Sequence, residues 1–248
     1  MPGLHQGCLD GHAAVESPQV DGGTVRANGL HGGVMLTTTD RRPWLVTCRP
    51  GTGLRLIGFP YAGGGPSLFR TWPGELLQDF ELCAVHLPGR EARMKEPPMG
   101  NLRQVVAELV EAIEPFCDRP VALFGHSIGG LLAFECAREL RRRFGISPVH
   151  LFVSGCPAPQ IRDQDRLCDL PDEEFLERMR RFNGTPRDIL DHTEMMELML
   201  PTLRADFALR DTYVYEDEPP LNCPISAFGG MADEAVGPEQ LERWKVHT

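Results

Sequence analysis

A short serine motif flanked by glycines constrains this chain more than any other feature. Ser127 lies in the pentapeptide Gly-His-Ser-Ile-Gly at 125–129, between an apolar run at 121–124 and a helix-like run at 131–137. A serine on a sharp turn between strand and helix is held in a strained conformation that exposes its Oγ, and its small neighbours let strand and helix pack closely. The pattern predicts a nucleophilic serine, with the first N–H groups of the following helix directed at an oxyanion.

Apolar segments and segments of helical periodicity alternate along most of the chain. Strands are predicted at 54–59, 81–87, 121–124, 149–154 and 225–229, and helices at 67–77, 101–116, 128–144 and 238–246. Such alternation is typical of an α/β fold in which a mostly parallel sheet is covered by helices on both faces. Asn101 is a suitable N-cap for the second of these helices.

The strand pattern disappears between about residues 157 and 220. Helices are predicted there at 172–182, 186–191 and 194–209. We expect this insertion to form a helical lid over the mouth of the site. Four methionines of the region either line a site for acyl chains, because the thioether side chain is compliant, or simply pack the lid helices: Met179, Met195, Met196 and Met199.

The composition excludes several classes of protein. The 248 residues suffice for one large domain, and a formal net charge of −10 argues against nucleic acid as the main partner. No run approaches the roughly 18 apolar residues that a membrane-spanning helix needs, so no membrane partner is expected. No metal site is visible, and the chemistry of a serine nucleophile requires neither a metal nor a cofactor.

Residues 1–41 differ from the rest of the chain, because they are rich in Gly, His and Asp and lack a sustained apolar period. We expect a flexible N-terminal arm there and a single domain over 42–248, with Met35 as a plausible alternative translation start. Eight cysteines are present without a C-x-x-C pair. Several lie in apolar runs, which indicates buried reduced thiols and a cytoplasmic location.

A serine hydrolase needs two oxyanion donors, and the N–H of the residue after the nucleophile, Ile128, is the first. The second is expected in the loop after the first parallel strand, which here is the glycine-rich segment 59–65. Glycines allow the backbone to approach a substrate closely, so the Ala62 N–H is our candidate, with the Tyr61 N–H as its neighbour. Taken alone, the glycines equally suit a structural turn.

The serine also needs a base, and the base needs a carboxylate that orients it. Asp233 follows the last predicted strand and is the candidate carboxylate, with Glu234 in reserve. In the chain order serine, acid, histidine, the base must follow Asp233, and His247 alone does so. His247 is nevertheless a weak candidate, because it ends the predicted helix 238–246 and no further strand carries a loop back to Ser127.

Several blocks of the sequence match one family together. They are Phe-Pro-Tyr-Ala-Gly-Gly at 59–64, Leu-Pro-Gly-Arg-Glu-Ala-Arg at 87–93, Glu-Pro-Pro at 96–98, the serine motif at 124–130, Leu-Pro-Thr-Leu-Arg-Ala-Asp at 200–206, Tyr-Val-Tyr at 213–215 and the acid region at 224–233. From about Trp44 to Thr248 the chain resembles the type II thioesterases that accompany modular polyketide and nonribosomal peptide synthetases. The resemblance implies an α/β-hydrolase fold and an editing activity, the hydrolysis of acyl thioesters from the phosphopantetheine arm of acyl or peptidyl carrier proteins.

The resemblance also implies a catalytic histidine in a loop well beyond the aspartate, whereas this sequence ends at Thr248. We therefore expect the last strand, the histidine loop and the final helix of the family to be missing. Serine without a base is a weak nucleophile, and loss of one triad member removes orders of magnitude of rate. Two alternatives stay open: a general serine carboxylesterase or acyltransferase, and a catalytically impaired protein that binds acyl carriers.

Carrier proteins are acidic, and this chain is itself net negative. Recognition of a carrier would then need a local basic patch. The candidates are arginines at the end of the helix after the serine, which equally suit a solvated helix end that complements the helix dipole: Arg138, Arg141, Arg142 and Arg143.

Overall fold

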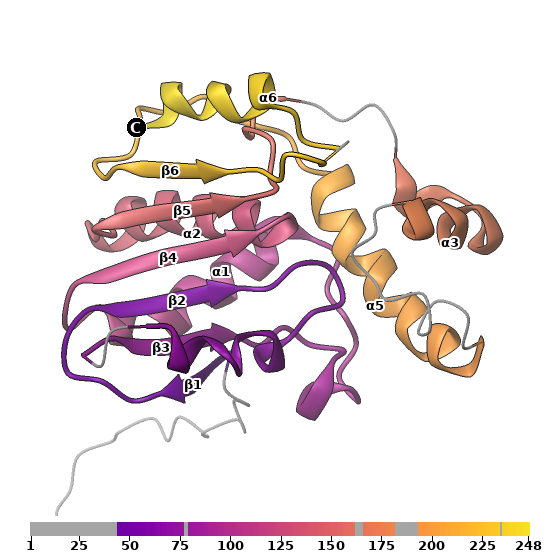
Figure 1. Ribbon diagram of the computed structural model, residues 1–248, viewed down its shortest axis with the longest axis horizontal. Coiled ribbons are helices and arrows are strands. Elements are labelled where there is room, and N and C mark those ends of the chain that lie inside the picture. Colours follow the sequence, from indigo (N-terminus) through magenta and orange to yellow (C-terminus); the bar gives the residue numbers. More distant parts are fainter. Residues whose placement is uncertain (1–43, 77–78, 162–165, 182–192, 234) are drawn as a thin grey trace, which may run out of the picture. The chain divides into compact units, whose positions relative to one another are not determined.

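A six-stranded sheet forms the centre of the computed structural model, which describes residues 44–76, 79–161, 166–181, 193–233 and 235–248 (Figure 1). The strands are β1 (Leu45–Arg49), β2 (Arg55–Phe59), β3 (Glu81–Val85), β4 (Val121–His126), β5 (His150–Ser154) and β6 (Ile225–Phe228), in the order β1-β3-β2-β4-β5-β6. Within this sheet β1 is antiparallel to β3, and the other pairings are parallel. The mostly parallel sheet predicted from the sequence is therefore confirmed.

The order of the strands reverses between β2 and β4. The chain leaves β3 and crosses β2 to reach β4, which pairs with β2 so that Phe59 lies opposite Gly125. Loops on the two sides of such a reversal diverge and leave a crevice at the carboxyl ends of the strands, where open α/β sheets bind ligands. The topology thus places the loop after Phe59 beside the turn at Ser127.

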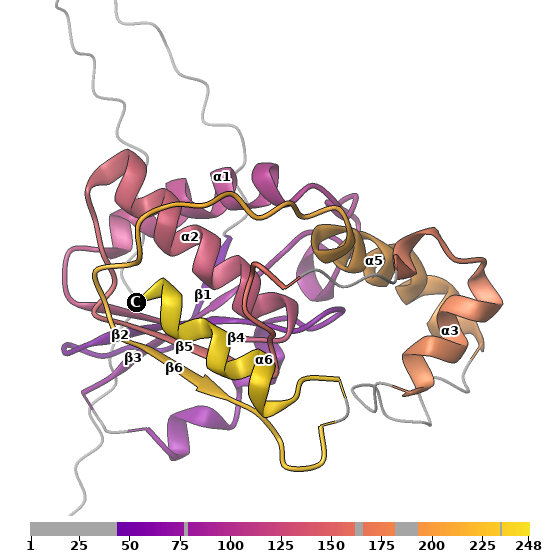
Figure 2. The same ribbon diagram turned by 90° about the horizontal axis from the view of Figure 1, so that it is seen from above.

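Alternate strand side chains enter two separate cores, which explains why the central strands are buried on both faces. The larger core lies beneath α1 (Leu102–Ile113) and α2 (Ile128–Phe144), which cover the same face of the sheet in Figure 2. The opposite face packs against Phe69 and Trp72, which belong to short 3-10 turns. Among the described residues, α-helices therefore cover one face of the central strands and 3-10 turns cover the other.

Several local expectations differ from the structure. The helix predicted at 67–77 is replaced by the 3-10 turns η1 (Pro66–Phe69) and η2 (Trp72–Gly74), because Pro73 has no N–H to donate and glycine disfavours a helix. The short antiparallel edge strand β1 was not predicted. The C-terminal helix is divided into α6 (Pro238–Glu242) and the 3-10 turn η6 (Arg243–His247).

The helices around the serine follow their sequence signals closely. The Asn101 side chain accepts a hydrogen bond from the Gln104 N–H at 3.1 Å and caps α1, as predicted. A 3-10 turn, η4 (Glu114–Phe116), continues α1. α2 occupies the predicted range and ends at Gly145, whose φ of 68° suits a residue without a side chain.

The predicted insertion contains α3 (Asp172–Arg181) and α5 (Thr193–Asp211), beyond the carboxyl ends of the parallel strands in Figure 1. The 3-10 turn η5 (Leu167–Asp169) precedes them, and the three elements share a small apolar core: Leu167, Phe175, Met179, Met196 and Leu203. Another 3-10 turn, η3 (Glu91–Arg93), lies in the loop after β3. No helix in the described ranges has the length and apolar character needed to cross a membrane.

Some expectations fall outside the described residues. These are the arm at 1–41 with Met35, the helix at 186–191 and the reserve carboxylate Glu234.

Candidate active site

Ser127 lies in a strained turn between β4 and α2. Its φ is 54° and its ψ is −124°, a conformation that is costly for any residue with a side chain. The Ser127 N–H donates to the Ser154 carbonyl at 2.8 Å, and the Ser127 carbonyl accepts from the Gly130 N–H at 2.9 Å. These two bonds hold the turn between β5 and the first turn of α2, and the Ser127 residue is left partly exposed.

The positions on either side of the Ser127 turn must be glycine because a Cβ would not fit there. A Cβ on Gly125 would overlap the Gly129 carbonyl group, and a Cβ on Gly129 would overlap the Phe59 carbonyl oxygen. Strand β4, helix α2 and the end of β2 therefore approach one another through bare backbone. This contact brings the first turn of α2, with the Ile128 N–H, directly against the start of the glycine-rich loop.

The glycine-rich loop uses its N–H groups unequally. The Gly63 N–H donates to Asp206 Oδ2 at 2.7 Å, and the Gly64 N–H donates to the Tyr61 carbonyl at 2.9 Å. The Ala62 N–H has no hydrogen-bond acceptor among the residues that the structure describes. Of these three successive donors, Ala62 is thus the one without an acceptor among the described residues, and its role as an oxyanion donor stays a prediction.

Sequence reasoning missed the two charged residues that hold this loop. Arg90 and Asp206 form a bidentate ion pair, with N–O distances of 2.7 and 2.8 Å, and both side chains are almost fully buried. Each lies in a block that carried the family resemblance, at 87–93 and 200–206. That was the only sequence signal, because nothing local indicates that two residues this far apart form a pair.

Asp233 lies in the loop after β6, at the same end of the sheet as Ser127. Its Oδ1 accepts hydrogen bonds from the N–H groups of Ala235 and Val236, at 2.9 and 3.1 Å. Burial lowers the pKa of His126, and the negative charge of Asp233 opposes that effect. The carboxylate is therefore within electrostatic reach of the residue that precedes Ser127.

The His126 ring is directed toward neighbouring segments. Its Nδ1 lies 3.0 Å from Ser154 Oγ, and its edge meets the Tyr61 ring with centroids 5.9 Å apart. Gly155, with φ 53°, leaves room for the ring, because a Cβ there would lie 2.9 Å from the imidazole. These contacts give His126 a packing role beside the turn.

His247 packs against the middle of α2. Its Nε2 lies 2.6 Å from Gln160 Oε1, and its ring lies 5.1 Å from the Phe134 ring centroid. Phe134 follows Ser127 by seven residues, which corresponds to about 10 Å along a helix. This placement does not support a role as general base, for which His247 was already a weak candidate.

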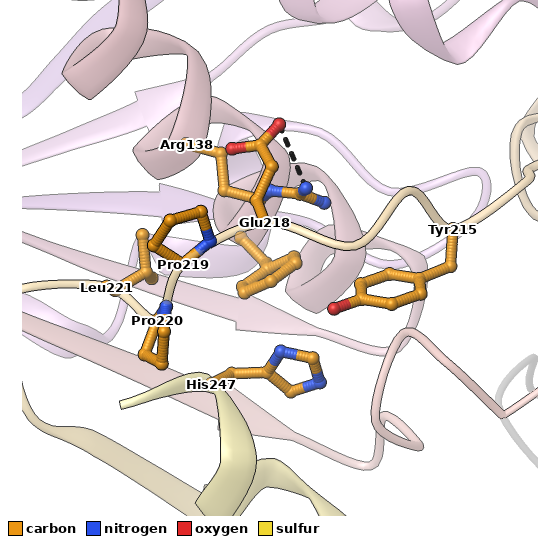
Figure 3. A pocket seen from close by; sticks show the side chains of 8 residues that line it. Arg138, Tyr215, Glu218, Pro219, Pro220, Leu221 and His247 are labelled. Carbon is orange, nitrogen blue, oxygen red and sulfur yellow. Dashed lines mark ion pairs between the residues drawn. The ribbon is translucent and has the colours of Figure 1, made fainter.

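Figure 3 shows the surroundings of His247. Eight side chains line a narrow crevice that has no room for a water-sized molecule: Phe134, Arg138, Tyr215, Glu218, Pro219, Pro220, Leu221 and His247. Burial and the positive charge of Arg138 lower the pKa of His247, and Asp217 acts in the opposite direction. His247 is therefore a core residue that fastens the C-terminal segment to α2. Within the described part of the chain, no histidine hydrogen-bonds to the Ser127 side chain.

The expected lid methionines have different surroundings. Met196 is buried in the lid core, Met195 is 42% exposed, and Met199 is partly buried. The methyl group of Met199 would lie 3.7 Å from a Cβ on Gly63. Of these three, only Met199 is placed by its contacts beside the glycine-rich loop.

The arginines expected to bind a carrier are paired within the domain. Ion pairs join Arg138, Arg141, Arg142 and Arg143 to Glu111, Glu135, Glu139 and Glu218 in several combinations. The Arg138 side chain is only 3% exposed. Arg141 and Arg142 follow Ser127 by about 20 Å along α2. Burial argues against a carrier-binding role for Arg138, whereas such a role for Arg141, Arg142 and Arg143 stays a prediction.

Comparison with known proteins places the chain in a family. A model of the thioesterase domain family matches residues 54–248. The gramicidin S biosynthesis protein GrsT of Aneurinibacillus migulanus is 45% identical over 209 residues, which cover 83% of this chain and 81% of that protein. The thioesterase PikA5 of Streptomyces venezuelae is 36% identical over 80% of this chain and 71% of that protein.

Solved structures agree with this relationship. The type II thioesterase BorB from the borrelidin biosynthetic cluster superimposes with a TM-score of 0.76 at 34% identity, covering 85% of this chain and 87% of that one. The six-stranded sheet and the Ser127 turn have the arrangement of an α/β-hydrolase. The chain therefore belongs to the thioesterase family, whose members hydrolyse thioesters.

Proposed function

We propose that this protein hydrolyses acyl thioesters carried on the phosphopantetheine arm of a carrier protein, with Ser127 as the nucleophile. One observation carries the proposal: Ser127 occupies a positive-φ turn between β4 and α2, beside a loop whose Ala62 N–H has no acceptor among the described residues. Such a turn presents a hydroxyl at the carboxyl ends of parallel strands. Membership of the thioesterase family supplies the type of bond that is cleaved.

In the proposed reaction, Ser127 Oγ attacks the thioester carbonyl carbon, and the carbon–sulfur bond then breaks. The proton of the hydroxyl passes through a base to the leaving thiol, and water releases the acid from the acyl-serine. The N–H groups of Ala62 and Ile128 bind the oxyanion, an interaction worth about 10²–10³ in rate per donor. We assign to Asp233 the orientation of this base, and the contacts of the four described histidines do not assign the role of base to any of them.

We propose carrier proteins as the partners because the similar proteins come from biosynthetic pathways. GrsT is named for gramicidin S biosynthesis, and BorB comes from a biosynthetic cluster and is called a type II thioesterase. The resemblance to type II thioesterases implies an editing role, the removal of stalled acyl groups from carrier proteins. We propose the same role for this protein. The seven described cysteines form no disulfide, in keeping with a cytoplasmic location, which is also part of the proposal.

The first test is hydrolysis of an acyl group attached to a phosphopantetheinylated carrier protein, measured for the wild type, Ser127→Ala and Ser226→Ala. Ser226 is a matched control, because it is a serine of β6 whose Oγ contacts His150. We expect serine-dependent turnover in the wild type and the control, and its loss in Ser127→Ala. Because no described histidine hydrogen-bonds to the Ser127 side chain, this loss is smaller than in an intact triad, whose contributions are not additive. Intact mass spectrometry should detect an acyl adduct that Ser127→Ala lacks. Hydrolysis that survives this substitution contradicts the proposal.

A second candidate function is binding of acylated carriers without turnover. The placement of His247 favours it, because Gln160 and Phe134 hold that ring away from Ser127. Carrier binding without an acyl adduct or hydrolysis would support this candidate. A third possibility is a general carboxylesterase. A parallel assay with the matching oxygen ester tests it, since a carboxylesterase would cleave the oxygen ester faster than the thioester.

A further inference from the structure

The glycine-rich loop is shaped by groups that lie far from it in the sequence. Its Gly63 N–H donates to Asp206 Oδ2 at 2.7 Å, and its Gly64 carbonyl accepts from Arg90 at 3.3 Å. Gly63 has φ 75°, and the Leu203 side chain fills the space that a Cβ would need. The conformation of the loop therefore depends on contacts with helix α5 and with the loop after β3.

Asp206 and Arg90 hold each other in one geometry. Their side chains are 2% and 4% exposed, and two parallel N–H···O bonds join them. Arg90 also donates to the Pro88 carbonyl at 3.1 and 3.2 Å, which fixes the guanidinium to its own loop. Bidentate, charge-assisted pairs of this kind leave little freedom to either partner. Asp206 Oδ2 is consequently a fixed acceptor for the Gly63 N–H.

We propose that Asp206 is a positioning residue for the oxyanion hole and acts through the backbone of Gly63. The inference rests on the proposed function of Ser127. Because Asp206 accepts the Gly63 N–H, it fixes the peptide plane between Ala62 and Gly63. The preceding N–H, that of Ala62, is then left in a defined orientation toward the oxyanion. Since a misplacement of about 1 Å at a catalytic group costs about 10²-fold in rate, this bond controls the reaction without touching the substrate.

The same bond couples the lid to the oxyanion hole, because Asp206 belongs to α5. Thr202, on the same helix, donates through its Oγ1 to the Gly89 carbonyl at 2.7 Å. Gly89 has φ 84° and lies directly against that hydroxyl. A shift of α5 away from the sheet would break these contacts and release the glycine-rich loop. The packing of α5 against these loops and the formation of the oxyanion hole are thus coupled.

The first experiment measures amide hydrogen exchange of the loop peptide 59–65 in Asp206→Asn and in the control Arg204→Gln. Arg204 lies on the same helix but donates to the carbonyls of Cys168 and Leu170, at 2.9 and 2.7 Å, and pairs with Asp172, so it anchors α5 to the segment before α3 and to the start of α3. We expect exchange to accelerate by about 10-fold or more in Asp206→Asn, with β4 unchanged. Arg204→Gln should keep the wild-type exchange of the loop. Because the asparagine oxygen can still accept from the Gly63 N–H, the proposal is overturned by unchanged loop exchange both in folded Asp206→Asn and in a folded double variant Arg90→Met, Asp206→Leu.

The second measurement is steady-state hydrolysis of the carrier-bound thioester. We expect kcat of Asp206→Asn to fall about 10- to 100-fold with KM changed less than about 3-fold, since an oxyanion hole acts on the transition state. Arg204→Gln should keep kcat within about 3-fold of the wild type. Equal losses of kcat in the two variants overturn the proposal, because general packing of α5 would explain both. If Ser127→Ala reveals no serine-dependent hydrolysis, the proposed function fails, while the exchange result still decides the role of Asp206.

A double variant tests the same proposal if Asp206→Asn does not fold. Asp206→Asn leaves the Arg90 charge buried without its full partner, which is costly. The double variant Arg90→Met, Asp206→Leu removes both charges together, and such neutral replacements are often tolerated. It should show the same fast exchange at Gly63 as Asp206→Asn. A folded double variant with wild-type protection of the loop contradicts the proposal.

Discussion

Ser127 and Glu91 are the non-glycine residues with positive φ in the described part of the chain. For Ser127 the conformation is fixed by hydrogen bonds to Ser154 and Gly130 and by the close contact of β4 with α2. Holding a side chain in such a region costs about 1–3 kcal/mol. The surrounding packing must supply that free energy, and the result is a hydroxyl held at the carboxyl ends of the strands.

Replacing Ser127 by glycine should therefore stabilise the protein relative to alanine at the same position. Both variants lack the hydroxyl, but glycine adopts positive φ without strain. After allowing for the larger entropy of glycine in the unfolded chain, we expect Ser127→Gly to exceed Ser127→Ala by about 1 kcal/mol in free energy of unfolding. Urea denaturation at pH 7.5 measures the difference.

The same pair of substitutions at Ser154 provides the control. Ser154 ends β5 and pairs with His126 in the sheet, so alanine should be favoured there by about 0.5–1 kcal/mol. If the alanine variant were more stable than the glycine variant at Ser127 as well as at Ser154, the result would show that the Ser127 turn relaxes once its hydroxyl is removed.

Single residues differed in how far the sequence could predict them. Ser127 was predictable because the requirement for its turn lies within five neighbouring residues. Asp206 and Arg90 were not, because they are 116 residues apart and each resembles an ordinary surface charge in the sequence. His247 was the only histidine after Asp233, yet its apolar neighbours Trp244 and Phe134 determine where it packs.

At the scale of elements, the contact of β4 with α2 holds the site together. Gly125 and Gly129 allow the two backbones to meet, and Gly130 lies against Cys156, where an added Cβ would come within 2.9 Å of the Cys156 Cβ. Any larger residue would separate the strand from the helix. The separation would also move the Ile128 N–H relative to the glycine-rich loop.

A methyl group at Gly125 should accordingly lower the stability of the protein, which urea denaturation measures. We expect Gly125→Ala to lower the free energy of unfolding by about 1–3 kcal/mol, because the new Cβ would overlap the Gly129 carbonyl group. Gly74→Ala is the matched control, since no atom lies close to a Cβ at that position. It should change stability by less than about 1 kcal/mol. Similar losses in the two variants would refute the argument from space.

Element boundaries were predictable where an apolar run is bounded by a clear cap or turn. α2 begins after the serine and ends before Gly145, as its residues indicate. The segment at 67–77 failed because its apolar spacing suits a helix, while Pro73 and Gly74 stop one from forming. β1 was missed because a five-residue edge strand is defined by its pairing with β3, which the local sequence does not reveal.

At the scale of the whole molecule, the C-terminal segment is fastened to the domain through the His247 ring. The ring packs against Phe134, Tyr215 and Trp244, and burial and Arg138 lower its pKa below the usual value. As pH falls below about 6.5, the unfolded chain takes up a proton that the folded state resists binding. The contribution of neutral His247 to the free energy of unfolding is therefore fully present at neutral pH. It is lost as the pH falls toward the pKa of His247 in the folded state.

His247→Gln should reduce this acid sensitivity. We expect the free energy of unfolding of the wild type to drop more between pH 7.5 and pH 5.5 than that of the variant, because glutamine does not titrate. Denaturant titrations at the two pH values give the comparison. The residual slope of the variant includes His126, whose pKa burial also lowers. Identical pH dependence in both proteins would show that His247 does not contribute.

The hydrogen bond from Gly63 to Asp206 also has a consequence for the order of folding. It joins residues 143 positions apart, whereas Gly125 and Gly129 are four positions apart. Long chain closures lose more entropy than local contacts and form later. During synthesis, the serine turn can take shape long before the acceptor for the Gly63 N–H leaves the ribosome. The oxyanion hole is then completed only after the serine turn and strands β1 to β5 have been synthesised, so reactivity follows the formation of most of the sheet.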